Sequence, residues 1–107
     1  MNKKENIILG GLLGMEKTLI GFLLAHRLQW RFVEVDRVIE ARAGLSIPDI
    51  FSLYGEAYFA PLEKETCRSL AHVNKLVVST GERTFLNPES LELLVPDGLV
   101  IWRGCFI

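Results

Sequence analysis

Short apolar runs alternate along the chain with longer stretches of helical periodicity. The apolar runs predict strands over 7–9, 31–36, 75–79 and 99–102. The stretches between them predict helices over 18–28, 36–43, 46–54, 56–73 and 87–94. In the helix predicted over 18–28, apolar residues fill one face and part of a second. Strands that alternate with helices favour a parallel sheet covered on both faces, with right-handed crossovers.

Several residues predict where these helices begin and end. Asp36, Ser46 and Asn87 each precede a helical pattern and are typical N-caps. Gly44 is typical of a helix end, because glycine adopts the left-handed backbone conformation without strain. Pro61 either kinks the helix over 56–73 or lies in its first turn.

The first apolar run breaks into glycines just before the first helical pattern. Gly11, Gly14, Lys17 and Thr18 fit a phosphate loop, in which backbone N–H groups surround phosphates, the lysine reaches the β- and γ-phosphates and the hydroxyl holds Mg²⁺. Glu16 stands where the motif has its last glycine. A glutamate adds a Cβ and a charge, and two like charges about 4 Å apart repel by about 4 kcal/mol at an effective dielectric near 20. We therefore expect a nucleotide site of reduced affinity.

Glu34 and Asp36 lie one residue apart at the carboxyl end of the strand predicted over 31–36. Ligands of open α/β sheets gather at the carboxyl ends of strands, so both acids point to the region of the phosphate loop. Solvated acids at a strand end are the alternative, and these two residues alone leave both interpretations open.

Composition narrows the function classes. The chain has 107 residues, which indicates one domain, and a net charge of −1, which favours neither nucleic acid nor a basic membrane surface. No uncharged run approaches the roughly 20 residues that cross a bilayer, and the N-terminus does not match a signal peptide, so we expect a cytoplasmic protein.

Cysteine and histidine spacing does not indicate a zinc site. Cys67 and Cys105 lie far apart and are interpreted as reduced thiols. His26 and His72 are isolated in helical stretches and are interpreted as surface residues rather than catalytic bases.

Beyond the phosphate loop, long segments of the chain resemble the shikimate kinase family from Asn6 to Trp102. The segments that carry the resemblance are 30–40, 44–51, 55–59 with Glu63, 77–81, 85–87 and 99–102. The resemblance implies a P-loop NTPase-like α/β fold, a three-layer sandwich with a central parallel sheet. It also implies transfer of the γ-phosphoryl group of ATP to a hydroxyl of shikimate, in aromatic amino acid biosynthesis.

The resemblance assigns roles to the residues of the motifs. Gly11, Gly14, Lys17 and Thr18 would bind ATP, with Lys17 also catalytic. Thr18 would hold Mg²⁺, and Glu34 stands where the family has a metal-associated aspartate.

On the substrate side, the resemblance makes Asp36 a catalytic residue that binds the shikimate hydroxyls and positions the attacking oxygen. Gly81 matches the first glycine of a substrate-side triplet, which here reads Gly81-Glu82-Arg83. The arginine that pairs with the shikimate carboxylate is expected right after Phe59, where this chain has Ala60. Arg83 is a candidate for a substitute positive charge.

The printed sequence ends shortly after Trp102, where the family continues with the lid over ATP, its catalytic arginine and a fifth strand. On this reading, residues 1–107 form a single partial domain that lacks the C-terminal lid and last strand. The strand over 99–102 would then be an open apolar edge through which copies self-associate. Three hypotheses remain: a divergent shikimate kinase with impaired or no catalysis, an inactive remnant that acts as an interaction module, and a truncated product without a selected function.

Overall fold

A computed structural model describes residues 6–10, 14–81, 84, 87–94 and 98–102 of the chain, with side chains described from Thr18 onward within the first helix and not within 98–102. Its centre is a four-stranded sheet in the order β2-β3-β1-β4, with every neighbouring pair parallel. The strands are β1 (Asn6–Gly10), β2 (Arg31–Glu34), β3 (Leu76–Ser79) and β4 (Gly98–Trp102). The helices are α1 (Gly14–Leu28), α2 (Val35–Ala43), α3 (Ile47–Leu53), α4 (Glu56–Ala71) and α6 (Pro88–Leu94).

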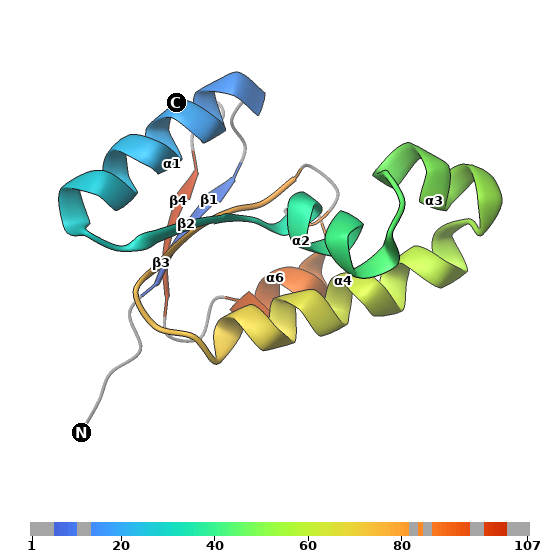
Figure 1. Cartoon of the computed structure of the whole chain (residues 1–107). Coiled ribbons are helices and arrows are strands. Elements are labelled where there is room, and N and C mark those ends of the chain that lie inside the picture. The colour runs from blue at the N-terminus through green and yellow to red at the C-terminus, as the bar shows by residue number, and fades with distance from the viewer. Residues whose placement is uncertain (1–5, 11–13, 82–83, 85–86, 95–97, 103–107) are drawn as a thin grey trace.

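Helices cover both faces of this sheet. Along β1 and β3, alternate residues point to opposite faces, as the period of a strand requires. Ile8 and Val78 join the core formed with α2, α4 and α6, whereas Leu9 and Val77 pack against α1. Figure 1 shows α1 on one side of the sheet and α4 and α6 on the other. The predicted parallel sheet between two helical layers is confirmed.

The predicted helix termini agree with the structure at three positions and differ from it at a fourth. The Ser46 hydroxyl accepts a hydrogen bond from the Asp49 N–H at 3.2 Å, Asn87 Oδ1 accepts one from the Glu89 N–H at 3.0 Å, and Gly44 ends α2 at φ +71°. The prediction that Asp36 caps α2 is wrong. The chain is extended at Glu34 (φ −107°, ψ 123°), which is the N-cap residue, and the helix begins at Val35.

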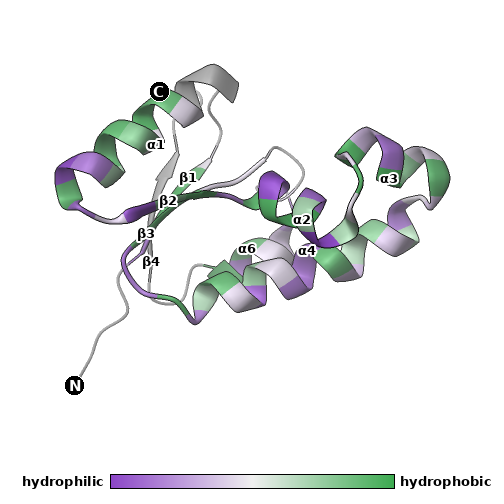
Figure 2. Ribbon diagram, in the orientation of Figure 1, coloured by the Kyte–Doolittle hydropathy of each residue, from purple (hydrophilic) through white to green (hydrophobic). Residues whose placement is uncertain are grey.

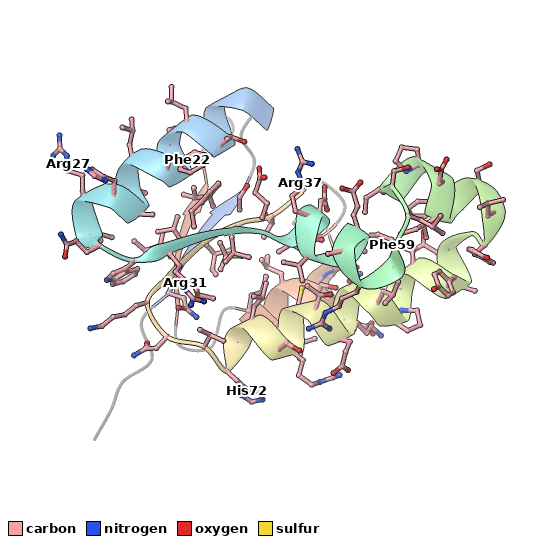
Figure 3. All side chains as sticks on the ribbon, in the orientation of Figure 1. Phe22, Arg27, Arg31, Arg37, Phe59 and His72 are labelled. Carbon is pink, nitrogen blue, oxygen red and sulfur yellow. The ribbon has the colours of Figure 1, made fainter. Side chains whose placement is uncertain are left out.

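Two further boundaries refine the predictions. Pro61 is the sixth residue of α4, beyond its first turn, and the helix continues to Ala71 rather than Val73. His72 follows as the C-cap residue and is exposed at the end of α4 (Figure 3), and His26 is exposed on α1. The interpretation of both histidines as surface residues is confirmed.

Helix α1 is apolar on two faces. Its inner side packs on the sheet through Ala25, and the ring of Phe32 from β2 lies against Gly21, where a Cβ would come within 2.0 Å of it. Leu19, Phe22 and Leu23 are 62%, 60% and 57% exposed on the outer side, and apolar turns run along α1 in Figure 2. None of the described helices is both long and apolar enough to cross a bilayer.

Candidate functional site

Three parallel strands end at the same level. Ser79 of β3 is in register with Leu9 of β1 and with Glu34 of β2. Thr80 then fixes the end of β3 to β1, because both its N–H and its hydroxyl donate to the Leu9 carbonyl oxygen, at 3.0 and 2.8 Å. Residues that follow β1, β2 and β3 therefore meet at one edge of the sheet.

The first group at this edge joins α1 to β2. The Thr18 hydroxyl donates a hydrogen bond to Glu34 Oε2 at 3.0 Å. Arg37 Nε lies 3.6 Å from Glu34 Oε1, and its side chain is 77% exposed, so this ion pair contributes little stability. In Figure 3, Arg37 extends from α2 away from α4. The sequence prediction that Thr18 and Glu34 share one site is consistent with this contact.

The chemistry of this group fits Mg²⁺. The ion prefers oxygen ligands and is usually held by one or two protein groups together with phosphate oxygens and water. Thr18 and Glu34 supply a hydroxyl and a carboxylate within hydrogen-bonding distance of each other. Among the described residues, no group of three or more His, Cys, Asp or Glu side chains is placed so that it could hold a metal ion.

The second group at this edge joins α2 to the end of β3. A Cβ at Gly81 would lie 2.5 Å from Asp36 Oδ2 and 2.8 Å from Oδ1, so only glycine lets the backbone approach the carboxylate this closely. Asp36 lies in the first turn of α2 instead of at a strand end, and this placement directs its side chain toward Gly81. Two residues 45 positions apart in sequence thus form one contact.

Other predicted site residues are described only in part. Gly14 and Lys17 lie in the first turn of α1, but the side chains of residues 14–17 are outside the description, as are Gly11, residues 82–83 and Cys105. The roles of Lys17 and of the glycines of the loop stay predictions.

Comparison of the chain with known proteins shows which family it belongs to. The family model for shikimate kinase matches residues 13–105. The chain belongs to the shikimate kinase family. A shikimate kinase from Geobacter sulfurreducens is 45% identical over 97 residues, which are 91% of this chain and 54% of that protein. One from Thermus thermophilus is 44% identical over 95 residues, 89% of this chain and 52% of the relative.

Solved structures agree with this assignment. The crystal structure of shikimate kinase from Aquifex aeolicus superposes with a TM-score of 0.85 at 35% identity, covering 95% of this chain and 61% of that one. The Acinetobacter baumannii shikimate kinase in complex with shikimate gives 0.84 at 33% identity, covering 92% and 55%. The fold class predicted from the resemblance is confirmed. The chain spans about half the length of the curated relatives it matches.

Sequence reasoning missed a buried acid in this shikimate kinase fold. A charged residue in a helical pattern is ordinarily exposed, yet Glu63 of α4 is only 2% exposed. Its Oε2 accepts from the Thr84 hydroxyl at 2.7 Å, and its Oε1 accepts from Asn87 Nδ2 and the Ser90 hydroxyl, both at 2.9 Å. The spacing of Phe59, Glu63 and Cys67 at intervals of four could have shown that the acid lies on the buried face.

The hydrogen bonds of Glu63 compensate the desolvation of its charge. A buried donor left without an acceptor costs about 1–3 kcal/mol, so removal of the carboxylate would expose Thr84, Asn87 and Ser90 to that penalty together. Lys64, the neighbour of Glu63, pairs instead with Glu89 at 2.6 Å on the surface. Its ammonium group holds the pKa of Glu89 below the usual range. Helices α4 and α6 are therefore joined by one buried and one exposed polar contact.

Cys67 lies on the same buried face of α4. Burial, with a smaller contribution from the negative charge of Glu63, raises the pKa of its thiol from the ordinary 9.0 to about 12, although a hydrogen bond with Ser90 opposes the change. The thiol therefore stays protonated at neutral pH, and the interpretation of Cys67 as a reduced thiol agrees with its free, buried state.

An open hollow of about 490 Å³ lies beside the first group, between the outer edge of β2 and α2. Its polar lining is formed by Glu34, Arg37 and Arg42, and its apolar lining by Phe32, Val33, Val38 and Ala41. The hollow does not include Thr18, Asp36 or Gly81. The hollow therefore shares Glu34 with the first group and does not reach the second group.

We expect Cys67 to resist alkylation by iodoacetamide at pH 8 in the folded protein and to react once the protein is unfolded. The raised pKa stabilises the folded state below pH 9, and this contribution is lost as the pH rises from 9 toward about 12. Peptide mass spectrometry distinguishes Cys67 from Cys105. Rapid labelling of Cys67 in native protein at pH 8 would contradict its burial.

Proposed function

We propose that this chain acts as a shikimate kinase-like protein of the cytoplasm that binds ATP with Mg²⁺ and shikimate, with impaired turnover. The observation that carries the proposal is the convergence of two contacts at one edge of the sheet, Thr18 with Glu34 and Asp36 with Gly81. The first fits the phosphate end of a nucleotide and the second fits a hydroxyl-bearing substrate. A phosphoryl-transfer site needs these two ligands next to each other.

On the nucleotide side, the backbone of the loop with Gly11 and Gly14 would surround the phosphates, and Lys17 would contact the β- and γ-phosphates. Thr18 and Glu34 would hold the magnesium ion. When bound, the ion neutralises charge that develops on the phosphate oxygens. The contribution of the protein is to orient the phosphates at the end of β1, where the helix α1 begins.

On the substrate side, Asp36 would accept hydrogen bonds from shikimate hydroxyls and orient the attacking oxygen. Gly81 has no Cβ, so its backbone lies directly against this carboxylate. The relative from Acinetobacter baumannii was solved in complex with shikimate, and it superposes on 92% of this chain. That structural likeness supports shikimate as the acceptor here.

Three substitutions support impaired turnover. By their places in the family motifs, Glu16 would bring a carboxylate toward the phosphates and Glu82 would bring one toward an anionic substrate. Ala60 cannot replace an arginine that pairs with the substrate carboxylate, because it has neither charge nor hydrogen-bond donors. Since phosphoryl transfer depends on positioning and charge stabilisation, each loss lowers the rate directly.

Calorimetric titration with Mg·ATP, alone and with shikimate present, tests the nucleotide site. We expect weak binding that Lys17→Ala abolishes and that Glu16→Gly strengthens about tenfold or more, a change of about 1.4 kcal/mol. The reason is that glycine removes both the Cβ and the charge.

Arg27→Ala, at the opposite end of α1, is the matched control and should leave the affinity unchanged. An absence of heat from both the wild-type chain and Glu16→Gly, in a folded sample, would contradict the nucleotide assignment. Binding that does not depend on Lys17 would place the nucleotide elsewhere.

Substitution of Ala60 by arginine tests the substrate side. A charge-assisted pair with a carboxylate contributes about 1.5–3 kcal/mol, so Ala60→Arg should tighten shikimate binding roughly 10- to 100-fold. Ala71→Arg adds the same charge at the far end of α4 and should change little. Equal affinities for the two variants would show that position 60 does not face the substrate carboxylate.

A second candidate function is an inactive module that pairs with other protein chains. Two observations favour it: β4 stands at the end of the described sheet, and Leu19, Phe22 and Leu23 are exposed on α1. An edge strand and an apolar helix face are both surfaces through which chains associate.

Multi-angle light scattering over a range of concentrations tests this candidate. We expect concentration-dependent self-association, which Leu23→Lys weakens if the outer face of α1 takes part. Arg27→Lys, on the same helix, keeps the charge and serves as the control. A monomer at the highest concentrations would rule out self-association through either surface.

A further inference from the structure

Glu63 is the one fully buried acid among the described residues, and all the donors to it come from a single segment of chain. Thr84, Asn87 and Ser90 lie within seven consecutive residues after β3. In the described part of the chain, Glu63 forms no salt bridge, so its charge is compensated by neutral side chains. Such a carboxylate favours one position for the groups that donate to it, because a buried donor that loses its acceptor costs free energy.

The segment held by Glu63 begins three residues after Gly81. Thr84 is fully buried, and its hydroxyl forms the shortest of the three hydrogen bonds, at 2.7 Å. Asn87 uses its amide group twice, since Nδ2 donates to Glu63 while Oδ1 caps α6. The start of α6 is therefore attached to α4 through the same acid.

Gly81 is held from both sides. Thr80, immediately before it, donates twice to the Leu9 carbonyl oxygen. Thr84, three residues after it, donates to Glu63. Between these two attachments, the Gly81 backbone lies against the Asp36 carboxylate, closely enough that a Cβ would come within 2.5 Å of an oxygen. A shift of either attachment would change that approach.

We propose that Glu63 is a positioning residue for the substrate side of the site: its buried carboxylate, through Thr84, holds the Gly81 backbone beside Asp36. The ligand named here, shikimate, rests on the proposed function, whereas the placement of Gly81 does not. Glu63 itself does not touch the substrate. Its contribution passes through the hydrogen bond to Thr84.

A purely structural role for Glu63 makes a different prediction. In that case its loss would lower stability and leave the geometry at Gly81 and the substrate affinity of the folded protein unchanged. Thr84→Val separates the two roles, because it removes one hydrogen bond with little change in volume. Glu63→Gln is the conservative variant, since its carbonyl oxygen still accepts from Asn87 and Ser90 and its amide can donate to the Thr84 hydroxyl.

Two control variants match these changes. Thr66 is as buried as Thr84 and lies on the same helix as Glu63, but within the described part of the chain its hydroxyl has no hydrogen-bond partner. Thr66→Val therefore repeats the threonine-to-valine change without breaking a contact. Ile39→Val removes one methylene group from the same core cluster, and so lowers stability without touching the segment after Gly81.

The experiment combines amide NMR spectra of the free protein with shikimate titration of the same variants. We expect Thr84→Val to shift the Gly81 and Asp36 amide resonances, to speed hydrogen exchange at Gly81 and to weaken shikimate binding about tenfold or more, with Mg·ATP affinity unchanged. Glu63→Gln should keep amide resonances, hydrogen exchange and shikimate affinity close to those of the wild type. Thr66→Val and Ile39→Val should resemble the wild type in all three measurements.

The two readouts distinguish the inference from the proposed function. Unchanged Gly81 and Asp36 resonances in Thr84→Val would overturn the inference, as would equal shikimate affinity in a wild-type chain that binds. Resonance shifts confined to Thr84→Val, in a chain that does not bind shikimate, would support the positioning by Glu63 and overturn the substrate assignment. Equal shifts in Ile39→Val would show a general loss of stability, and would overturn the inference.

Discussion

The Leu9 carbonyl oxygen accepts two hydrogen bonds from Thr80, and this contact fixes the end of β3 against the end of β1. Because β2 pairs with β3 in the same register, Glu34 is carried to the same level. The start of α1, the first turn of α2 and Gly81 all follow from these strand ends. The sheet register therefore brings together groups that belong to three separate segments of the sequence.

Much of the fold could be predicted, because strands that are covered on both faces appear in the sequence as short continuous apolar runs. Ile8 and Leu9 point to opposite layers, and both layers are apolar. Ser46, Asn87 and Gly44 act on backbone groups within a few residues in sequence. Such local effects can be predicted from the local sequence. The position of Asp36 was harder, since a one- or two-residue difference in where a strand ends depends on the backbone at Glu34.

The contact between Thr18 and Glu34 was expected from a motif and a strand end, whereas the burial of Glu63 depends on long-range contacts. Thr18 and Glu34 belong to known patterns, and their hydrogen bond agrees with them. The burial of Glu63 depends on how α4 packs against the segment with Thr84, Asn87 and Ser90, which a single sequence does not contain. Acids are rarely buried, although the helical spacing of Glu63 with Phe59 and Cys67 places it on the inner face of α4.

The hydrogen bonds of Glu63 also bear on how this fold can change during evolution. One acid serves three donors, so a descendant that loses Glu63 keeps three buried or half-buried groups with no acceptor. Single substitutions at Thr84, Asn87 or Ser90 leave the charge with fewer donors instead. Positions 63, 84, 87 and 90 are therefore expected to change together during evolution. A sequence in which only one of them has been replaced would represent an intermediate between two complete sets.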